Sequence, residues 1–281
     1  MMNRISPKVA NTNEAGAVLA ELNYTRPGGP KPAVYLYETP EPHPSIEERN
    51  ESHQIVIHDA RSQLENLSLD THGFAVTHGV TAVRDFDDPE ELKRVYDAEV
   101  AALVKANTGA RHVLVFDHTV RRIGGDDKDA ASRAPVHVVH NDYTKKSGPQ
   151  RVRDLLPPEE AEEVLKSRFA IVNVWRSING TVEDTPLAFA DARTVPDEDW
   201  IATDLKYPDR TGEVYRIAFN PEHRWFYVPR LQTDEIILLK TFDSATDGRA
   251  RYAPHSAFRD PATMPGTEKR QSIESRVLVF F

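Results

Sequence analysis

The sequence contains no cysteine among its 281 residues. This absence excludes disulfide bonds, thiolate nucleophiles, iron–sulfur clusters and zinc sites built on cysteine. Long hydrophobic runs are also missing, and a membrane-spanning helix needs roughly 18 consecutive apolar residues or more. The segment Met1–Leu22 lacks the apolar core of a signal peptide. We therefore expect a soluble, cytoplasmic protein.

Positive charge is in short supply. There are 35 Lys and Arg residues against 44 Asp and Glu residues, which gives a formal net charge of -9. Such a chain repels a phosphate backbone overall, and no Lys- or Arg-rich run offsets that repulsion. We therefore expect a small-molecule substrate as partner, with no nucleic acid and no membrane surface. A homodimer remains possible because dimers are the commonest oligomers.

Short runs rich in β-branched and aromatic residues recur along the chain, and polar, Pro- or Gly-containing segments separate them. Strands dominate the second half, and strict βαβ alternation is absent. This order argues against a Rossmann sheet and favours a mainly β fold with flanking helices and a jelly-roll core. The predicted strands are Ala33–Tyr37, Gln54–His58, Val113–Phe116, Val136–His140, Phe169–Trp175, Val214–Phe219, Trp225–Val228, Glu235–Phe242 and Ser275–Phe281.

Two segments are typical of helices. Asp88-Pro89 places an N-cap residue before a first-turn proline, and apolar residues then follow at spacings of three and four. Pro158 begins a shorter helix by the same reasoning. No internal repeat or interdomain linker is evident, so we expect a single domain over residues 1–281. Within it, residues 1–110 form an N-terminal decorating region, and residues 111–281 form the jelly-roll core with the metal site.

A candidate metal-binding pair lies at His140-Asn141-Asp142. His140 is the only histidine followed by Asp or Glu two residues later. Side chains at positions i and i+2 of a strand project from the same face, so His140 and Asp142 can reach one metal ion. His137, three residues before His140, should face the opposite side. With His255 as a distal third ligand, the set matches the facial triad of non-haem Fe(II) oxygenases, although zinc in a metal hydrolase is an alternative.

A candidate anion-binding pair follows the distal histidine. Arg270-Gln271-Ser272 comes 15 residues after His255 and directly precedes the apolar C-terminal strand. A planar guanidinium binds a carboxylate through two parallel hydrogen bonds, and a serine hydroxyl can add a third. Arg270 and Ser272 are therefore predicted to bind the remote carboxylate of 2-oxoglutarate.

His-x-Asp, a distal histidine and then Arg-x-Ser resembles the Fe(II)/2-oxoglutarate-dependent oxygenase superfamily. More narrowly, the chain from about Leu114 to its C-terminus is similar to the family of cephamycin hydroxylase and the fungal hydroxylase/desaturases of secondary metabolism. The stretches that carry this likeness are Asn173-Val174-Trp175-Arg176, Pro186-Leu187-Ala188, Asp243-Ser244, Pro254–Phe258 and Arg270–Arg276. The resemblance implies a double-stranded β-helix (jelly-roll) core, Fe(II) as metal, and 2-oxoglutarate and dioxygen as co-substrates. It also implies the hydroxylation, desaturation or cyclisation of a small specialised metabolite, with release of succinate and carbon dioxide.

Three further residues are candidates for the co-substrate pocket. Asn173 and Trp175 share one face of a predicted strand, although Trp175 can equally serve the core. Arg276 should face the same side of the last strand as Arg270, six residues earlier. It can bind 2-oxoglutarate or a substrate carboxylate, or it can pair with a structural acid such as Glu274.

A non-catalytic jelly-roll or cupin-like protein that binds a metal or ligand is the main alternative function. Such a protein would keep the scaffold and lack the iron or the co-substrate site. The position of Arg270 and Ser272 after His255 favours the oxygenase over both this alternative and the hydrolase.

Overall fold

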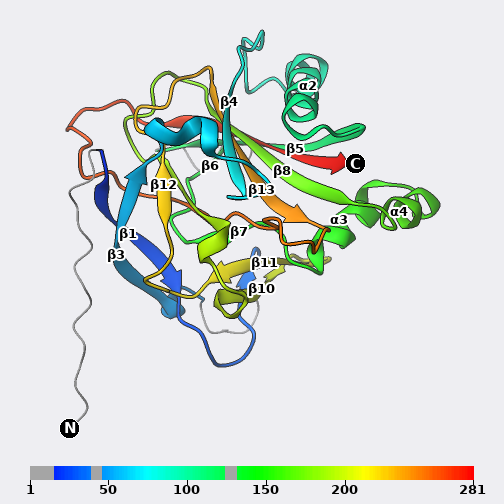
Figure 1. Cartoon of the computed structure of the whole chain (residues 1–281), viewed down its shortest axis with the longest axis horizontal. Coiled ribbons are helices and arrows are strands. Elements are labelled where there is room, and N and C mark those ends of the chain that lie inside the picture. The colour runs from blue at the N-terminus through cyan, green and yellow to red at the C-terminus, as the bar shows by residue number, and fades with distance from the viewer. Residues whose placement is uncertain (1–15, 39–45, 124–131) are drawn as a thin grey trace.

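The computed structural model describes residues 16–38, 46–123 and 132–281, and in this part of the chain the strands form two sheets (Figure 1). The nine-stranded sheet has the order β1 (Val18–Thr25), β3 (Asn50–Asp59), β12 (Trp225–Tyr227), β9 (Leu187–Ala190), β14 (His255–Ala257), β7 (His140–Asn141), β11 (Thr211–Ile217), β10 (Trp200–Lys206), β2 (Ala33–Tyr35). The six-stranded sheet has the order β4 (Phe74–His78), β13 (Glu235–Asp243), β8 (Phe169–Ser177), β15 (Gln271–Phe280), β5 (His112–Arg122), β6 (Ser132–Arg133). The predicted mainly β, jelly-roll fold is confirmed.

Helices flank these sheets. Helix α1 (Pro89–Glu91) begins where the sequence predicts, because the Asp88 side chain accepts a hydrogen bond from the Glu90 backbone N–H. A π-helical turn (η3, Leu92–Tyr96) continues it into α2 (Asp97–Thr108). The later helices are α3 (Ser147–Leu155) and α4 (Pro158–Val164), of which α4 was predicted. Short 3₁₀ turns complete the set: η1 (Ile46–Arg49), η2 (Arg61–Asn66), η4 (Ala192–Thr194) and η5 (Asp197–Asp199).

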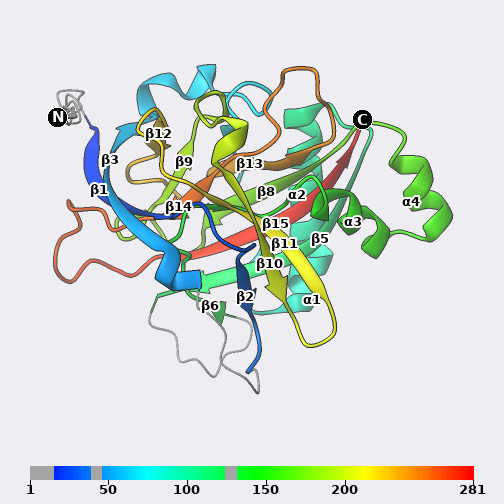
Figure 2. The same cartoon turned by 90° about the horizontal axis from the view of Figure 1, so that it is seen from below.

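The two faces of the six-stranded sheet have different neighbours. Alternate apolar residues of β8 and β15, such as Val172 and Val277, pack with Val100 and Val104 of α2 in one buried cluster. In two perpendicular views α2 lies beside β5, along this outer face (Figures 1 and 2). The helix thus covers one face of the sheet, and the residues of opposite phase point to the interior.

The interior face is apolar at one end and polar in its middle. Phe169 and Ile171 of β8 pack with Val152 of α3 and Ala161 of α4, so these two helices close that end. Figure 2 shows α3 and α4 together near the C-terminus. Two residues further along β8, Asn173 lies directly opposite Arg276 of β15. Along β8 the interior face is therefore apolar beside α3 and α4 and becomes polar at Asn173.

Residues before 111 contribute strands to both sheets. β1 pairs with β3, β3 pairs with β12 of the core, and β4 pairs with β13. The nine-stranded sheet curls, because Asn23 of β1 forms a bridge with Val138 beside β7. The side-chain Nδ2 of Asn23 also donates a hydrogen bond to the His137 carbonyl oxygen, at 2.8 Å.

The predicted strand Val136–His140 is wrong over most of its length. Only His140–Asn141 is strand, and Val138 takes part in a single isolated bridge. The neighbouring β14 has three residues, so just one pair, His255 with His140, joins it to β7. Single hydrogen bonds hold the rest of the segment before His140, among them the bond from Ala257 N to Val136 O at 2.8 Å. The other predicted runs overlap the observed β2, β3, β5, β8, β11, β12, β13 and β15.

Candidate metal centre

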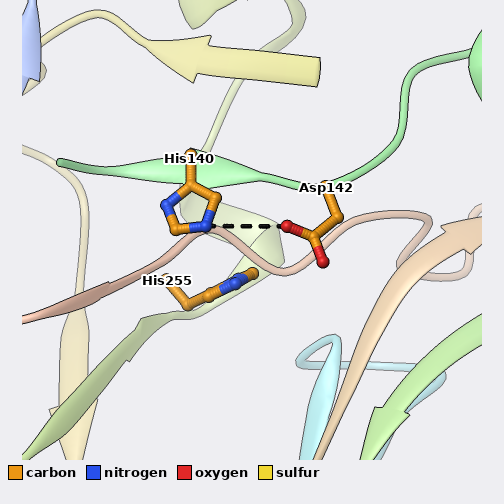
Figure 3. Close-up of side chains that lie close together, drawn as sticks. All are labelled: His140, Asp142 and His255. Atoms are coloured by element: carbon orange, nitrogen blue, oxygen red, sulfur yellow. Dashed lines mark ion pairs between the residues drawn. The ribbon is translucent and has the colours of Figure 1, made fainter. Parts of the chain in front are cut away.

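Three predicted ligands meet inside the sheets. One donor atom from each of His140, Asp142 and His255 lies within 4.8 Å of the other two, and this is the only such group among the described residues (Figure 3). Strand pairing brings the two histidines together, because His255 of β14 lies directly opposite His140 of β7. Their ring centroids are 4.4 Å apart. Asp142 follows β7 immediately. His137 is not part of the group, as predicted.

Backbone carbonyls orient both imidazoles. Nδ1 of His140 lies 2.7 Å from the Val138 oxygen, and Nδ1 of His255 lies 2.9 Å from the Ala253 oxygen. A carbonyl oxygen only accepts hydrogen bonds, so each Nδ1 carries a proton, and Nε2 is the nitrogen that offers a lone pair when the ring is neutral. Nε2 of His255 is buried without a hydrogen-bond partner. A buried, unpartnered nitrogen of this kind is explained when a metal ion supplies the partner.

The charges at this centre also suit a cation. Burial lowers the pKa of His140 to about 3, with a further contribution from His255, so its imidazole is neutral at ordinary pH. Burial raises the pKa of Asp142, but the Arg276 charge and the two histidines outweigh it and hold that pKa well below its usual range. Two imidazoles and one carboxylate fit Fe(II), and three ligands leave further coordination positions open.

Two predicted pocket residues contact the carboxylate of Asp142. Nδ2 of Asn173 donates to Asp142 Oδ2 at 2.8 Å, and Nε of Arg276 donates to the same oxygen at 3.0 Å. Arg276 also binds Glu274, at 2.5 Å, and Asp117. The pairing of Arg276 with Glu274 is one of the two alternatives that the sequence left open. Because Oδ2 is occupied twice, Oδ1 is the oxygen that remains directed at His140, 3.6 Å from its Nε2.

Asn141, between the two ligands, is a positioning residue that sequence reasoning missed. Its buried Nδ2 donates to the carbonyl oxygens of Tyr143 at 2.7 Å and Thr241 at 2.9 Å, and its Oδ1 accepts from Ala253 N at 3.3 Å. These bonds join β7 to β13 and to the segment before His255. The sequence did contain a signal for this role. Asn141 stands between two ligands that share one face of the strand, so its neutral polar side chain must face the other way, toward the core, where it needs hydrogen-bond partners.

Arg270, Ser272 and Trp175 form a second group. Arg270 is 3% exposed, its Nη1 donates to the Thr185 oxygen at 2.5 Å, and its Nε has no partner. The Ser272 hydroxyl is also buried without a partner, and the guanidinium carbon lies 5.4 Å from the Trp175 ring centroid. Burial and the neighbouring Arg121 lower the pKa of Arg270 to about 9. A desolvated cation beside a free hydroxyl suits a carboxylate ligand.

Comparisons with known proteins agree with this chemistry. A family model described as an oxidoreductase/YMDC permease-like domain matches residues 22–280. The hydroxylase/desaturase efuI of Hormonema carpetanum is 36% identical over 250 residues, which cover 81% of this chain and 83% of that protein. The Fe(II)/2-oxoglutarate-dependent dioxygenase nvfI of Aspergillus novofumigatus is 33% identical over 276 residues, or 93% and 96% of the two chains.

A solved structure is similar over nearly the whole chain. The iron and alpha-ketoglutarate-dependent endoperoxidase NvfI superimposes with a TM-score of 0.83 and 28% sequence identity. The superposition covers 94% of this chain and 98% of the other. The likeness therefore includes both sheets and the strands that carry the candidate metal centre.

Proposed function

Because the chain belongs to the family of Fe(II)/2-oxoglutarate-dependent dioxygenases and hydroxylase/desaturases, we propose that His140, Asp142 and His255 hold its iron. The observation that carries this assignment is the meeting of three donor atoms within 4.8 Å, with the buried Nε2 of His255 unpartnered. The carbonyls at Nδ1 keep both Nε2 atoms available as ligands.

Arg270 and Ser272 bind the distal carboxylate of 2-oxoglutarate in this proposal. Their unpartnered Nε and Oγ atoms are the polar groups that such a carboxylate satisfies. Trp175 packs beside the guanidinium and excludes water from it. Iron supplies the oxidising chemistry with dioxygen, and the co-substrate leaves as succinate and carbon dioxide.

Asn173 and Arg276 act as positioning residues rather than as contacts of the co-substrate. Both occupy Oδ2 of Asp142 and so direct Oδ1 to the metal. Arg276 also keeps the carboxylate ionised, since its charge lowers the pKa of Asp142. Their role is to fix the geometry and the charge of one ligand.

We further propose that the substrate is a small specialised metabolite that is hydroxylated, desaturated or cyclised. Relatives are named hydroxylase/desaturase, and the structural neighbour is named an endoperoxidase, so one scaffold supports several oxidative outcomes. None of the helices in the described segments is long and apolar enough to cross a membrane. The net charge of -9 favours a small-molecule partner over nucleic acid. We propose that the protein acts in the cytoplasm, without a membrane partner, as a homodimer, the commonest kind of oligomer.

Succinate formation tests the proposal without the native substrate. Purified protein is incubated with Fe(II), ascorbate and 2-oxoglutarate in air, and succinate is quantified by mass spectrometry. We expect succinate from the wild type and from the control His78→Ala, because the His78 side chain is 67% exposed and is not among the candidate ligands. His255→Ala should form none. A wild type that binds 2-oxoglutarate but forms no succinate would favour the non-catalytic alternative.

A further inference from the structure

Arg216 lies in the same cross-strand row as the two candidate metal histidines. Arg216 of β11 is directly opposite His140 of β7, and His140 is directly opposite His255 of β14. Directly opposite residues of antiparallel strands project from the same face, with Cβ atoms about 4.5–5.5 Å apart. The Arg216 side chain therefore starts one strand away from a candidate ligand and on the same face of the sheet.

Two nitrogens of this guanidinium lack partners. Nε and Nη1 of Arg216 are buried without a hydrogen bond among the described residues. Burial lowers the pKa of Arg216 despite the opposing charge of Glu47, so desolvation dominates its surroundings. Arg276, by contrast, uses Nε, Nη1 and Nη2 in bonds to the protein. Buried guanidinium nitrogens without partners are costly, and an anionic ligand that accepts their hydrogen bonds removes that cost.

The co-substrate already has a separate proposed anchor, at Arg270 and Ser272. Arg270 and Ser272 belong to the β15 side of the six-stranded sheet, whereas Arg216 comes from the nine-stranded sheet. One molecule of 2-oxoglutarate offers one distal carboxylate, so a second unpartnered guanidinium near the metal suits a second organic ligand.

We propose that Arg216 binds a carboxylate of the primary substrate and thereby holds that substrate beside the metal. This inference rests on the proposed oxygenase function and narrows its substrate to a small organic acid. The planar fork of Arg216 binds both carboxylate oxygens, which fixes the orientation of the acid as well as its position. Arg216 is then a specificity-determining residue in the nine-stranded sheet, opposite the co-substrate anchor.

Thermal unfolding of the ligand-free protein is the first test. Arg216→Met keeps the aliphatic length and removes an unpartnered buried charge, so we expect a higher Tm than in the wild type. Arg276→Met, the matched control, removes a paired arginine and should lower the Tm. A lower Tm for Arg216→Met would show a structural role for Arg216 and overturn the proposal.

Probe binding is the second test. The complex with Zn(II) and saturating 2-oxoglutarate, which occupies the Arg270 site, is titrated with 4-fluorobenzoate or the neutral 4-fluorobenzamide by ¹⁹F NMR. We expect the wild type to prefer the carboxylate about tenfold or more, the range for hydrogen bonds to a charged group. Arg216→Gln should abolish this preference, and Arg216→Lys should keep part of it. Arg210→Gln, which alters an arginine stacked on Tyr207, should behave as the wild type.

Each other result contradicts the inference. Equal affinity of the wild type for both probes, no binding of either, or an unchanged preference in Arg216→Gln would overturn it. A loss of 2-oxoglutarate binding in Arg216→Gln would assign the residue to the co-substrate. Succinate formation by the wild type separates these failures from a failure of the proposed function.

Discussion

At the scale of single residues, the candidate centre depends on which atom of each side chain remains free. Carbonyls occupy Nδ1 of both histidines, and Asn173 with Arg276 occupies Oδ2 of Asp142. The remaining donors, two Nε2 atoms and Oδ1, face one another (Figure 3). Hydrogen bonds from surrounding residues thus select the ligand atoms before any metal binds.

Replacement of Arg276 should strongly destabilise the protein. Arg276→Gln leaves Asp142, Glu274 and Asp117 without their shared cation, and breaking a buried ionic network by removing one partner costs about 3–5 kcal/mol. Urea unfolding measures the loss. The control Arg153→Gln removes an exposed partner of Glu162 and should leave the unfolding midpoint unchanged. Equal effects of the two substitutions would contradict the positioning role of Arg276.

The co-substrate anchor gives a graded prediction. Arg270→Lys keeps the charge and loses the fork, so the KM for 2-oxoglutarate should rise sharply while iron affinity stays constant. Ser272→Ala should cost about 1 kcal/mol, roughly fivefold in affinity, for one lost hydrogen bond. Succinate production at varied 2-oxoglutarate measures both. An unchanged KM in Arg270→Lys would move the anchor to another arginine.

At the scale of elements, the centre is built on very short strands. β7 has two residues and β14 has three. Side-chain hydrogen bonds of Asn141 supplement their short pairing by joining β7 to Thr241 of β13 and to Ala253, which precedes β14. Longer strands of the six-stranded sheet hold the residues that orient Asp142. The ligand strands are therefore positioned by their neighbours more than by their own pairing.

Asn141→Leu tests this dependence. The substitution leaves the Thr241 carbonyl and the Ala253 N–H unsatisfied in the interior, at about 1–3 kcal/mol for each buried group. We expect reduced stability together with weaker iron binding, measured by urea unfolding and by metal titration. Asn107→Leu, on the exposed face of α2, should change neither. Weaker stability with unaltered iron affinity would show that Asn141 does not position the ligands.

The sequence predicts the residues of the centre better than the elements that carry them. His140, Asp142 and His255 could be chosen because residue type and spacing are visible in the chain, and they do meet. The strand assumed to carry the first pair is mostly absent, since β7 pairs with β14 at one position and with β11 at two. The contacts of Asn141 and Arg216 depend on cross-strand register, which is a tertiary property without a local sequence signal.

At the scale of the whole molecule, buried histidines couple stability to pH. Burial lowers the pKa of His223 below its ordinary value of 6.5, although Asp199 opposes the shift. His140 is lowered in the same direction, to about 3. The unfolded chain therefore binds more protons below pH 6.5. The stability from these neutral imidazoles is present above that pH and is lost as the pH falls toward the folded-state values.

This coupling is measured by urea unfolding of the metal-free protein at two pH values. They are about 7.0 and 5.5, above and below the ordinary histidine pKa. Each additional proton bound by the unfolded state contributes a slope of about 1.4 kcal/mol per pH unit. His223→Gln should reduce the slope of the wild type, and His78→Gln, at an exposed position, should keep it. A slope that is identical in all three proteins would contradict the assignment of His223.

We propose that one iron lies between His140, Asp142 and His255 and that 2-oxoglutarate reaches from it to Arg270. The most direct measurement is an anomalous difference map at the iron absorption edge, from crystals grown without oxygen with Fe(II) and 2-oxoglutarate. We predict a single peak about 2.0–2.2 Å from Nε2 of both histidines and Oδ1 of Asp142, with the distal carboxylate of 2-oxoglutarate on Arg270 and Ser272. A peak at any other residues, or that carboxylate on Arg216, would contradict it.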